Sequence, residues 1–117
     1  MSNDETNKED FFKILGKFIH ENGITIDRPK GSVHPRFSDF IYPLDYGYIN
    51  GTQSQDGSGI DIFRGDDPNV GIVGVICTVD PRKKDSEVKV LYQCTEENIQ
   101  TALRVMNNVL RGILIRR

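Results

Sequence analysis

Apolar side chains recur at helical spacing near the N-terminus and predict a helix over residues 8–22. Thr6 and Glu9 have the spacing of a capping box at its start, so residues 1–7 are expected to form a flexible arm. Gly23 supplies the stop. The stripe expected to face the core consists of Phe11, Ile14, Leu15 and Phe18.

Short apolar runs separated by turn residues fill the middle of the chain, a pattern typical of β-strands. The turn dipeptides Asn50-Gly51 and Asp56-Gly57 predict short antiparallel strands around them. The continuous apolar run Val70–Val79 predicts a central strand, and Ser86–Tyr92 alternates as a half-buried strand does. The strand candidates in chain order are 24–27, a stretch within 42–49, 59–63, 70–79 and 86–92.

A second helix is predicted from Thr95, a good N-cap residue, to about residue 110, with Gly112 ending it. Its buried stripe would consist of Ile99, Leu103, Met106 and Leu110. The order helix, about five short strands, helix predicts an α+β fold with a small barrel-like sheet. All 117 residues are expected to form one domain, because a chain of this length buries enough surface for a single modest core.

Charge narrows the range of partners. Lys and Arg number 15 and Asp and Glu 17, which gives a net charge of −2. No basic surplus exists to hold nucleic acid by counterion release, so nucleic acid is not expected as a partner. The last fourteen residues contain four arginines and no acid, a pattern that fits contact with an acidic partner or a solvated helix end.

Cysteine use and the N-terminus indicate a cytoplasmic protein. Cys77 lies inside the apolar run and is expected to be a buried free thiol, and Cys94 is the other cysteine. The polar, acidic N-terminus is unlike a signal peptide. The apolar run is far shorter than the roughly 20 residues that span a bilayer, so no membrane partner is expected.

Four aspartates stand at predicted turns and strand ends, in two pairs with the same five-residue step. Asp56 opens a turn and Asp61 lies in the next strand, whereas Asp80 ends the apolar strand and Asp85 starts the one that follows. If the two hairpins are neighbours, the four carboxylates meet at one end of a sheet and repel one another. A hard divalent cation would relieve this repulsion, and Mg²⁺ prefers a few carboxylates with water and phosphate oxygens.

Spacing alone leaves a second interpretation open. Asp56, Asp80 and Asp85 can be ordinary turn residues, because aspartate is enriched in turns. Asp61 differs, since an acid in the middle of an apolar strand is costly without a partner. On the strand that begins at Asp85, Lys89 lies on the same face as Asp85 because side chains alternate.

Three motifs in order resemble soluble inorganic pyrophosphatases. The run Ile41-Tyr42-Pro43-Leu44-Asp45-Tyr46-Gly47-Tyr48-Ile49 is similar to that family's Tyr-Pro-x-x-Tyr-Gly-Tyr-Ile segment. Asp56-Gly57-Ser58-Gly59-Ile60-Asp61 follows at the right distance to resemble its signature Asp-x-Asp-Pro-x-Asp. Asp80 and Asp85 are similar to the family's later pair of metal-binding aspartates, so the resemblance covers about residues 24–92.

The resemblance implies a five-stranded, OB-like β-barrel flanked by an N-terminal and a C-terminal helix. It implies Mg²⁺-dependent hydrolysis of inorganic pyrophosphate to two phosphates, with Mn²⁺ as an alternative ion. The implied metal ligands are Asp56, Asp61, Asp80 and Asp85, with Asp56, Asp61 and Tyr46 in catalytic roles. The implied contacts to substrate phosphate are Tyr42, Tyr46, Lys89, Lys30 and Arg36. The family often forms oligomers, so a homo-oligomer is an open expectation.

The chain departs from the family pattern at two charged positions. The middle acid of the signature is Ser58 here, and the lysine two residues after the last metal aspartate is Glu87. Lys89 lies two residues further on the same strand face and can replace that lysine in part. Lys30 and Arg36 are also consistent with a solvated loop, and Arg28 and His34 are expected to be structural.

Three functional hypotheses follow. The first is a metal-dependent enzyme that hydrolyses pyrophosphate or a related phosphoanhydride. The alternative is a weakened or inactive module that keeps a site for metal and a phosphate-containing ligand. The third is an interaction domain that uses helix 95–110 and the arginine-rich tail against another protein.

Overall fold

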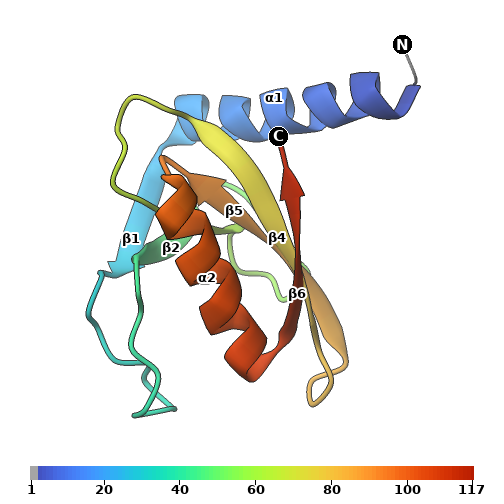
Figure 1. The fold of residues 1–117 in the computed structure, drawn as a ribbon. Coiled ribbons are helices and arrows are strands. Elements are labelled where there is room, and N and C mark those ends of the chain that lie inside the picture. The colour runs from blue at the N-terminus through green and yellow to red at the C-terminus, as the bar shows by residue number, and fades with distance from the viewer. Residues whose placement is uncertain (1–2) are drawn as a thin grey trace.

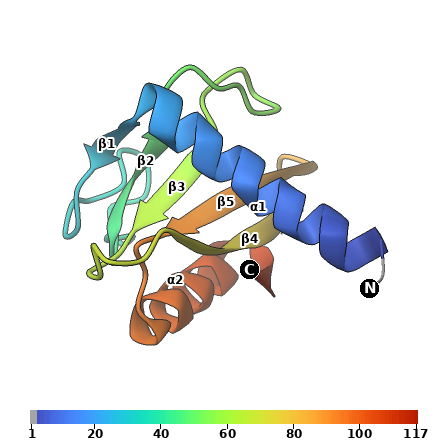
Figure 2. The same cartoon turned by 90° about the horizontal axis from the view of Figure 1, so that it is seen from above.

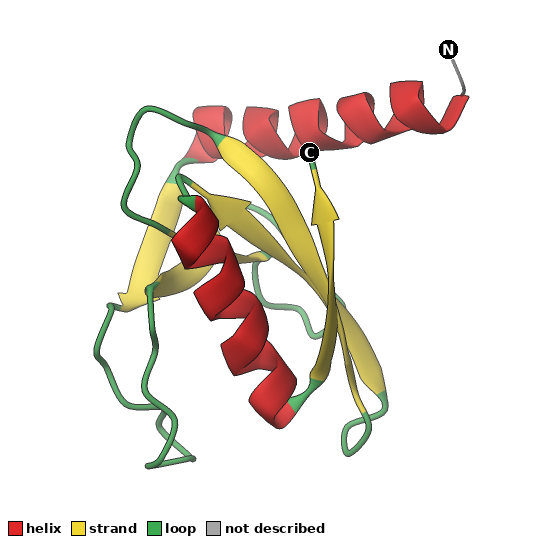
Figure 3. Cartoon of the chain, viewed as in Figure 1, coloured by secondary structure: helices red, strands yellow, loops and turns green. Residues whose placement is uncertain are grey.

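The computed structural model describes residues 3–117, which form two helices and six strands (Figure 1). The elements are α1 (Asn3–Asn22), β1 (Ile24–Arg28), β2 (Asp45–Ile49), β3 (Asp61–Arg64), β4 (Ile72–Asp80), β5 (Asp85–Tyr92), α2 (Glu96–Val109) and β6 (Arg111–Arg116). Figure 3 shows the helices set against a single sheet. The predicted α+β class is therefore confirmed.

The six strands form one open, mixed sheet in the order β1-β2-β3-β5-β4-β6. Neighbouring strands are antiparallel, except that β3 and β5 run parallel. This differs from the expected closed barrel of five strands. Closure of β1 to β5 would require β1 to pair with β4, but β6 occupies that edge of β4 by pairing Arg111–Arg116 with Gly74–Val79.

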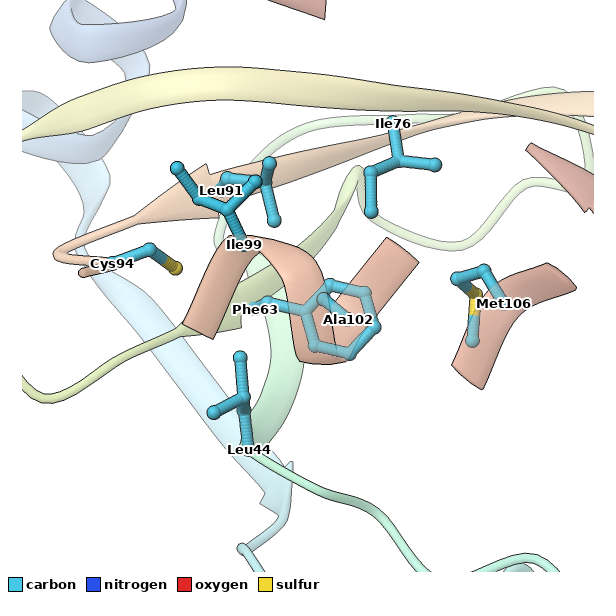
Figure 4. Packing of buried hydrophobic residues seen from close by; sticks show 8 residues of the cluster. All are labelled: Leu44, Phe63, Ile76, Leu91, Cys94, Ile99, Ala102 and Met106. Carbon is cyan, nitrogen blue, oxygen red and sulfur yellow. The ribbon is translucent and has the colours of Figure 1, made fainter. Parts of the chain in front are cut away.

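Two apolar cores lie on opposite faces of the sheet, one under each helix (Figure 2). Neighbouring residues on the three central strands contribute to different cores, because strand side chains alternate. The α1 core includes Ile62, Val75 and Val90, and the α2 core includes Phe63, Ile76 and Leu91. Figure 4 shows Ile99, Ala102 and Met106 of α2 packed on the second of these cores.

The first helix is longer than predicted. Residues 3–7, expected as part of an arm, form its first turns, so Thr6 lies inside the helix and is not its N-cap. Asp4 and Glu5 in the first turn stabilise this start, since carboxylates interact favourably with a helix N-terminus. Residues 1–2 lie outside the described residues. The predicted stop is confirmed, because Gly23 has a φ of 73° and its N–H bonds to the carbonyl of Ile19.

The C-terminal segment contains a strand, β6, that the sequence pattern did not predict. Thr95 caps α2 as predicted, with Thr95 Oγ1 accepting a hydrogen bond from the Asn98 N–H. The helix ends at Val109, and Asn107 then closes a tight connection by bonding both the N–H and the carbonyl of Gly112. The chain is thereby turned back along β4 as β6 and does not end in a helix.

Cysteine placement also differs from the prediction. Cys77 is half-buried and Cys94 is the buried cysteine, although both are free thiols. Cys77 points to the α1 face, where it packs at the edge of the core.

Neither helix within residues 3–117 combines the length and apolar character needed to cross a membrane.

Candidate metal and phosphate site

All four predicted aspartates line one cavity of about 650 Å³ on the α2 face of the sheet. Asp56 comes from the loop between β2 and β3, and Asp61 is the first residue of β3. Asp80 and Asp85 are the last residue of β4 and the first of β5. Two segments distant in sequence, 56–61 and 80–85, therefore bring carboxylates to the same cavity, at the end of the sheet beyond the C-terminal turn of α2.

Strand alternation explains why these side chains share a face. Asp61 lies two residues before Phe63, and Lys89 two residues before Leu91, so both polar side chains point to the α2 side below the apolar core. Asp61 and Lys89 are direct partners across the parallel strands β3 and β5. The predicted common face of Asp85, Glu87 and Lys89 is confirmed, since all three line the cavity.

Lys89 is the centre of a hydrogen-bonded network in the cavity. Its ammonium donates to Asp61 Oδ2 at 2.9 Å, to Glu87 Oε2 at 2.9 Å and to Tyr46 Oη at 2.8 Å. Tyr46 in turn donates its hydroxyl to Asp61 Oδ2 at 2.6 Å. The expectation that Asp61 needs a partner inside the sheet is confirmed, and it has two.

Burial and charge determine the protonation of this network. Burial would lower the pKa of Lys89, but its interactions with Tyr46, Asp61 and Glu87 outweigh it and raise the pKa above its ordinary value. Burial, reinforced by the Asp61 carboxylate, raises the pKa of Tyr46. The cavity therefore contains a permanent ammonium and a neutral phenol at neutral pH.

Asp56 is held by its own loop. Its Oδ1 accepts hydrogen bonds from the Ser54 hydroxyl at 2.6 Å and from the Ser58 N–H at 3.0 Å. The Ser54 hydroxyl, followed by the Ser58 N–H, lowers the pKa of Asp56. Asp56 is thus a turn residue, as the simpler interpretation expected, and it still lines the cavity.

Asp80 and Asp85 face each other across the β4–β5 hairpin. Asp80 Oδ1 accepts the N–H groups of Arg82 at 2.9 Å and Lys83 at 3.3 Å, which fixes the start of the turn. Burial tends to raise the pKa of Asp80, but these two N–H groups and the nearby Arg82 and Lys83 charges lower it overall. Asp80 and Asp85 are thus two like charges at opposed positions on neighbouring strands, with Arg82 and Lys83 beside them.

The turn role and the charge of Asp80 can be separated by mutation. Asp80→Asn keeps an oxygen acceptor for the two N–H groups but loses the charge, so we expect its urea unfolding midpoint to lie between those of the wild type and Asp80→Ala. Asp80→Ala removes the acceptor and should lower the midpoint. Because the pKa of Asp80 is lowered on folding, its charge stabilises the fold above the unfolded pKa of about 3.9. The difference in unfolding midpoint between Asp80→Ala and wild type should therefore narrow as the pH falls below about 4. Equal midpoints for Asp80→Asn and Asp80→Ala at pH 7 would contradict the turn role.

The donor set is compatible with Mg²⁺, although no chelating cluster is preformed. Within residues 3–117, no three Asp, Glu, His or Cys side chains are grouped closely enough to hold an ion by themselves. Mg²⁺ commonly binds through one or two carboxylates, with water and substrate phosphate completing its shell. Asp80 with Asp85, and Asp61 with Asp56, are the carboxylates that could take this part.

Cationic side chains surround the acids. Arg36, a predicted contact to substrate phosphate, lines the cavity, but Lys30 is exposed outside it, and its backbone N–H bonds to Asp45. Tyr42 is buried beside the cavity rather than lining it, and its ring packs on Tyr46 with centroids 5.2 Å apart. The structure therefore does not bring Lys30 and Tyr42 to the cavity wall.

Four cationic or titratable residues of the cavity were not predicted. Arg28 and His34 were expected to be structural, and Arg82 and Lys83 were part of a hairpin loop without an assigned role. Burial, followed by the charges of Arg28, Arg36 and Lys83, lowers the pKa of His34. The only signal in the sequence was the position of Arg82 and Lys83 directly after Asp80-Pro81.

Comparison with known proteins adds no relationship: no protein-family model matches the chain, and no curated protein matches it. The resemblance to inorganic pyrophosphatases therefore stands on the three motifs alone and stays a prediction.

Proposed function

We propose that this chain is a Mg²⁺-dependent phosphoanhydride hydrolase that converts inorganic pyrophosphate to two phosphates. One observation carries the proposal: four aspartates from two separate segments line a single cavity together with Arg28, Arg36, Arg82, Lys83 and Lys89. We also propose that β1–β5 correspond to the five strands of the OB-like barrel of the pyrophosphatase family, with β6 added on the open edge.

The mixed charge of the cavity suits a diphosphate. Carboxylates repel a phosphate anion, so acids and substrate share a site only where cations stand between them. Bound Mg²⁺ would shield the negative charge of the phosphate oxygens and would lower the pKa of a water molecule bound to it. Asp80 and Asp85 are the first candidates to hold it, because their opposed carboxylates repel each other across the hairpin.

The protein's own groups would orient and stabilise the substrate. The Lys89 ammonium is a fixed positive charge, and its three hydrogen bonds hold it inside the cavity. The Tyr46 hydroxyl is neutral and bonded to Asp61, so it keeps that carboxylate oriented and can donate to a phosphate oxygen when the bond rearranges. Arg36 and Arg82 provide guanidinium groups at the cavity wall, which suit phosphate oxygens.

The test is phosphate release from pyrophosphate by the wild-type protein. We expect release above the protein-free rate with millimolar Mg²⁺ and release at the protein-free rate in excess EDTA. Release at the protein-free rate in both conditions contradicts the hydrolase.

A second candidate function is a module that binds metal and a phosphate ligand without turnover. Two observations favour it: Lys89 already forms ion pairs with Asp61 and Glu87, and the residue at the position of the middle signature acid is Ser58. Calorimetric titration distinguishes it from the enzyme. Heat of binding for Mg²⁺ with pyrophosphate, in the absence of release, is the result expected of a binding module.

A further inference from the structure

The cavity extends well beyond its charged end. Its wall continues over an aromatic and aliphatic surface made by Phe37, Phe40, Met106, Val109 and Leu110. A volume of about 650 Å³ is in the range of sites for small organic molecules and exceeds what a bare diphosphate fills. Phe37 and Val109 are the exposed members of this wall, and a purely inorganic substrate would leave them without a ligand contact.

Phe37 is the most prominent side chain of the apolar wall. It is 46% exposed, although it is a large aromatic, and Val109 of the same wall is 42% exposed. The His34 ring lies 4.9 Å from the Phe37 ring, and the Arg82 guanidinium lies 5.5 Å from its centroid. An accessible ring with cationic and planar neighbours is the kind of surface on which nucleic-acid bases stack.

Arg82 connects the apolar wall to the acidic end. Its side chain is placed over Phe37 and also 4.0 Å from the Asp80 carboxylate. A ligand that follows Arg82 would therefore reach both surfaces, with an aromatic group at Phe37 and phosphates near Asp80. In Figure 1 the loop before β2, the end of α2 and the β4–β5 hairpin all lie toward the same end of the molecule.

We propose that the cavity takes a nucleoside diphosphate or triphosphate, with the base on Phe37 and the phosphates at the aspartates. This rests on the proposed function and extends its substrate class from the bare diphosphate to diphosphates that carry a nucleoside. In the reaction, the oxygen of water bonds to the terminal phosphorus while the bond from that phosphorus to the bridging oxygen breaks. The bridging oxygen keeps the electron pair and stays on the nucleoside phosphate, and one proton passes to solvent.

Binding of non-hydrolysable analogues tests this assignment. The probes are α,β-methylene-ADP and methylenediphosphonate, titrated calorimetrically in Mg²⁺ into the full chain. We expect the nucleotide analogue to bind wild type more tightly, and Phe37→Ala to weaken it by about tenfold, the loss of one base–aromatic stack. Phe37→Ala should change the affinity for methylenediphosphonate less than about twofold. Phe37→Trp, which keeps an aromatic ring at this position, should bind the nucleotide analogue as the wild type does.

A matched control is available on α1. Phe11 is 43% exposed and lies outside the cavity, so Phe11→Ala removes a comparable ring and should change neither affinity. Equal losses for both probes in Phe37→Ala, or tighter binding of methylenediphosphonate than of the nucleotide by wild type, would overturn the nucleotide assignment and leave the proposed hydrolase standing. Geranyl diphosphate bound as tightly as the nucleotide would also overturn it, because an isoprenyl chain has no aromatic ring to stack as a base does. Absence of binding by every probe would overturn the proposed function as well.

Discussion

Asp61→Asn is expected to lower Mg²⁺-dependent phosphate release by about 10²–10⁴-fold, the usual effect of losing a group that acts in the reaction. Asparagine has nearly the same shape, so the Tyr46 hydroxyl keeps an acceptor, but the negative charge in the cavity is lost. Without that charge, the side chain at position 61 can neither hold a cation nor balance the positive charge of Lys89. The measurement is the initial rate of phosphate release from pyrophosphate at saturating Mg²⁺.

Asp45→Asn is the matched control for this variant. Asp45 is also a half-buried strand aspartate paired with a cation, since its Oδ2 lies 3.0 Å from Arg64 and its side chain is 29% exposed against 26% for Asp61. It does not line the cavity. We expect its activity to stay within about twofold of wild type once folding is confirmed by circular dichroism. Equal activity of Asp61→Asn and Asp45→Asn would show that Asp61 has no role in turnover.

Lys89→Met is expected to destabilise the fold by about 3 kcal/mol, the range in which the loss of one partner of a buried ion pair falls. The Lys89 side chain is only 7% exposed, and methionine fills its volume without replacing the ammonium. Asp61 on β3 and Glu87 on β5 then both lose the cation to which they are bonded. Urea unfolding at pH 7 measures the change, with the exposed Lys30→Met as control.

The pH dependence of this effect follows from the raised pKa of Lys89. A group whose pKa rises on folding contributes its full stability below the unfolded value, about 10.4 for lysine, and loses it as the pH rises through the folded value. The gap between wild type and Lys89→Met should therefore be constant from pH 7 to about pH 10 and narrow only above that. A gap below about 1 kcal/mol at pH 7 would mean that the ammonium does not hold the network together.

Local signals predicted most of the fold. The Thr95 cap and the Gly23 stop depend on neighbouring residues, and both are observed where expected. Strand β6 was missed because Arg111–Arg116 is short and follows a helix directly. Its strand conformation depends on pairing with β4 and on the Asn107 contact to Gly112, which are tertiary features that local propensity does not contain.

The candidate site was predictable where chemistry forces a partner. A carboxylate at Asp61 inside an apolar strand had to be compensated, and strand parity placed Lys89 on a face from which it could do so. The cavity positions of Arg28, His34 and Phe37 were not predictable, because they depend on how the end of β1 and the loop before β2 lie over the sheet. Tyr42 was assigned to substrate from a motif, whereas its ring is buried in aromatic packing.

Paramagnetic broadening in amide NMR spectra locates bound metal most directly. Mn²⁺ is titrated into the ¹⁵N-labelled chain in the presence of methylenediphosphonate. The expected result is selective broadening of amides around Asp56, Asp61, Asp80 and Asp85, reversed by excess Mg²⁺. Broadening centred instead on Asp4 and Asp10 of α1, or no selective broadening at all, would contradict a metal site in the shared cavity.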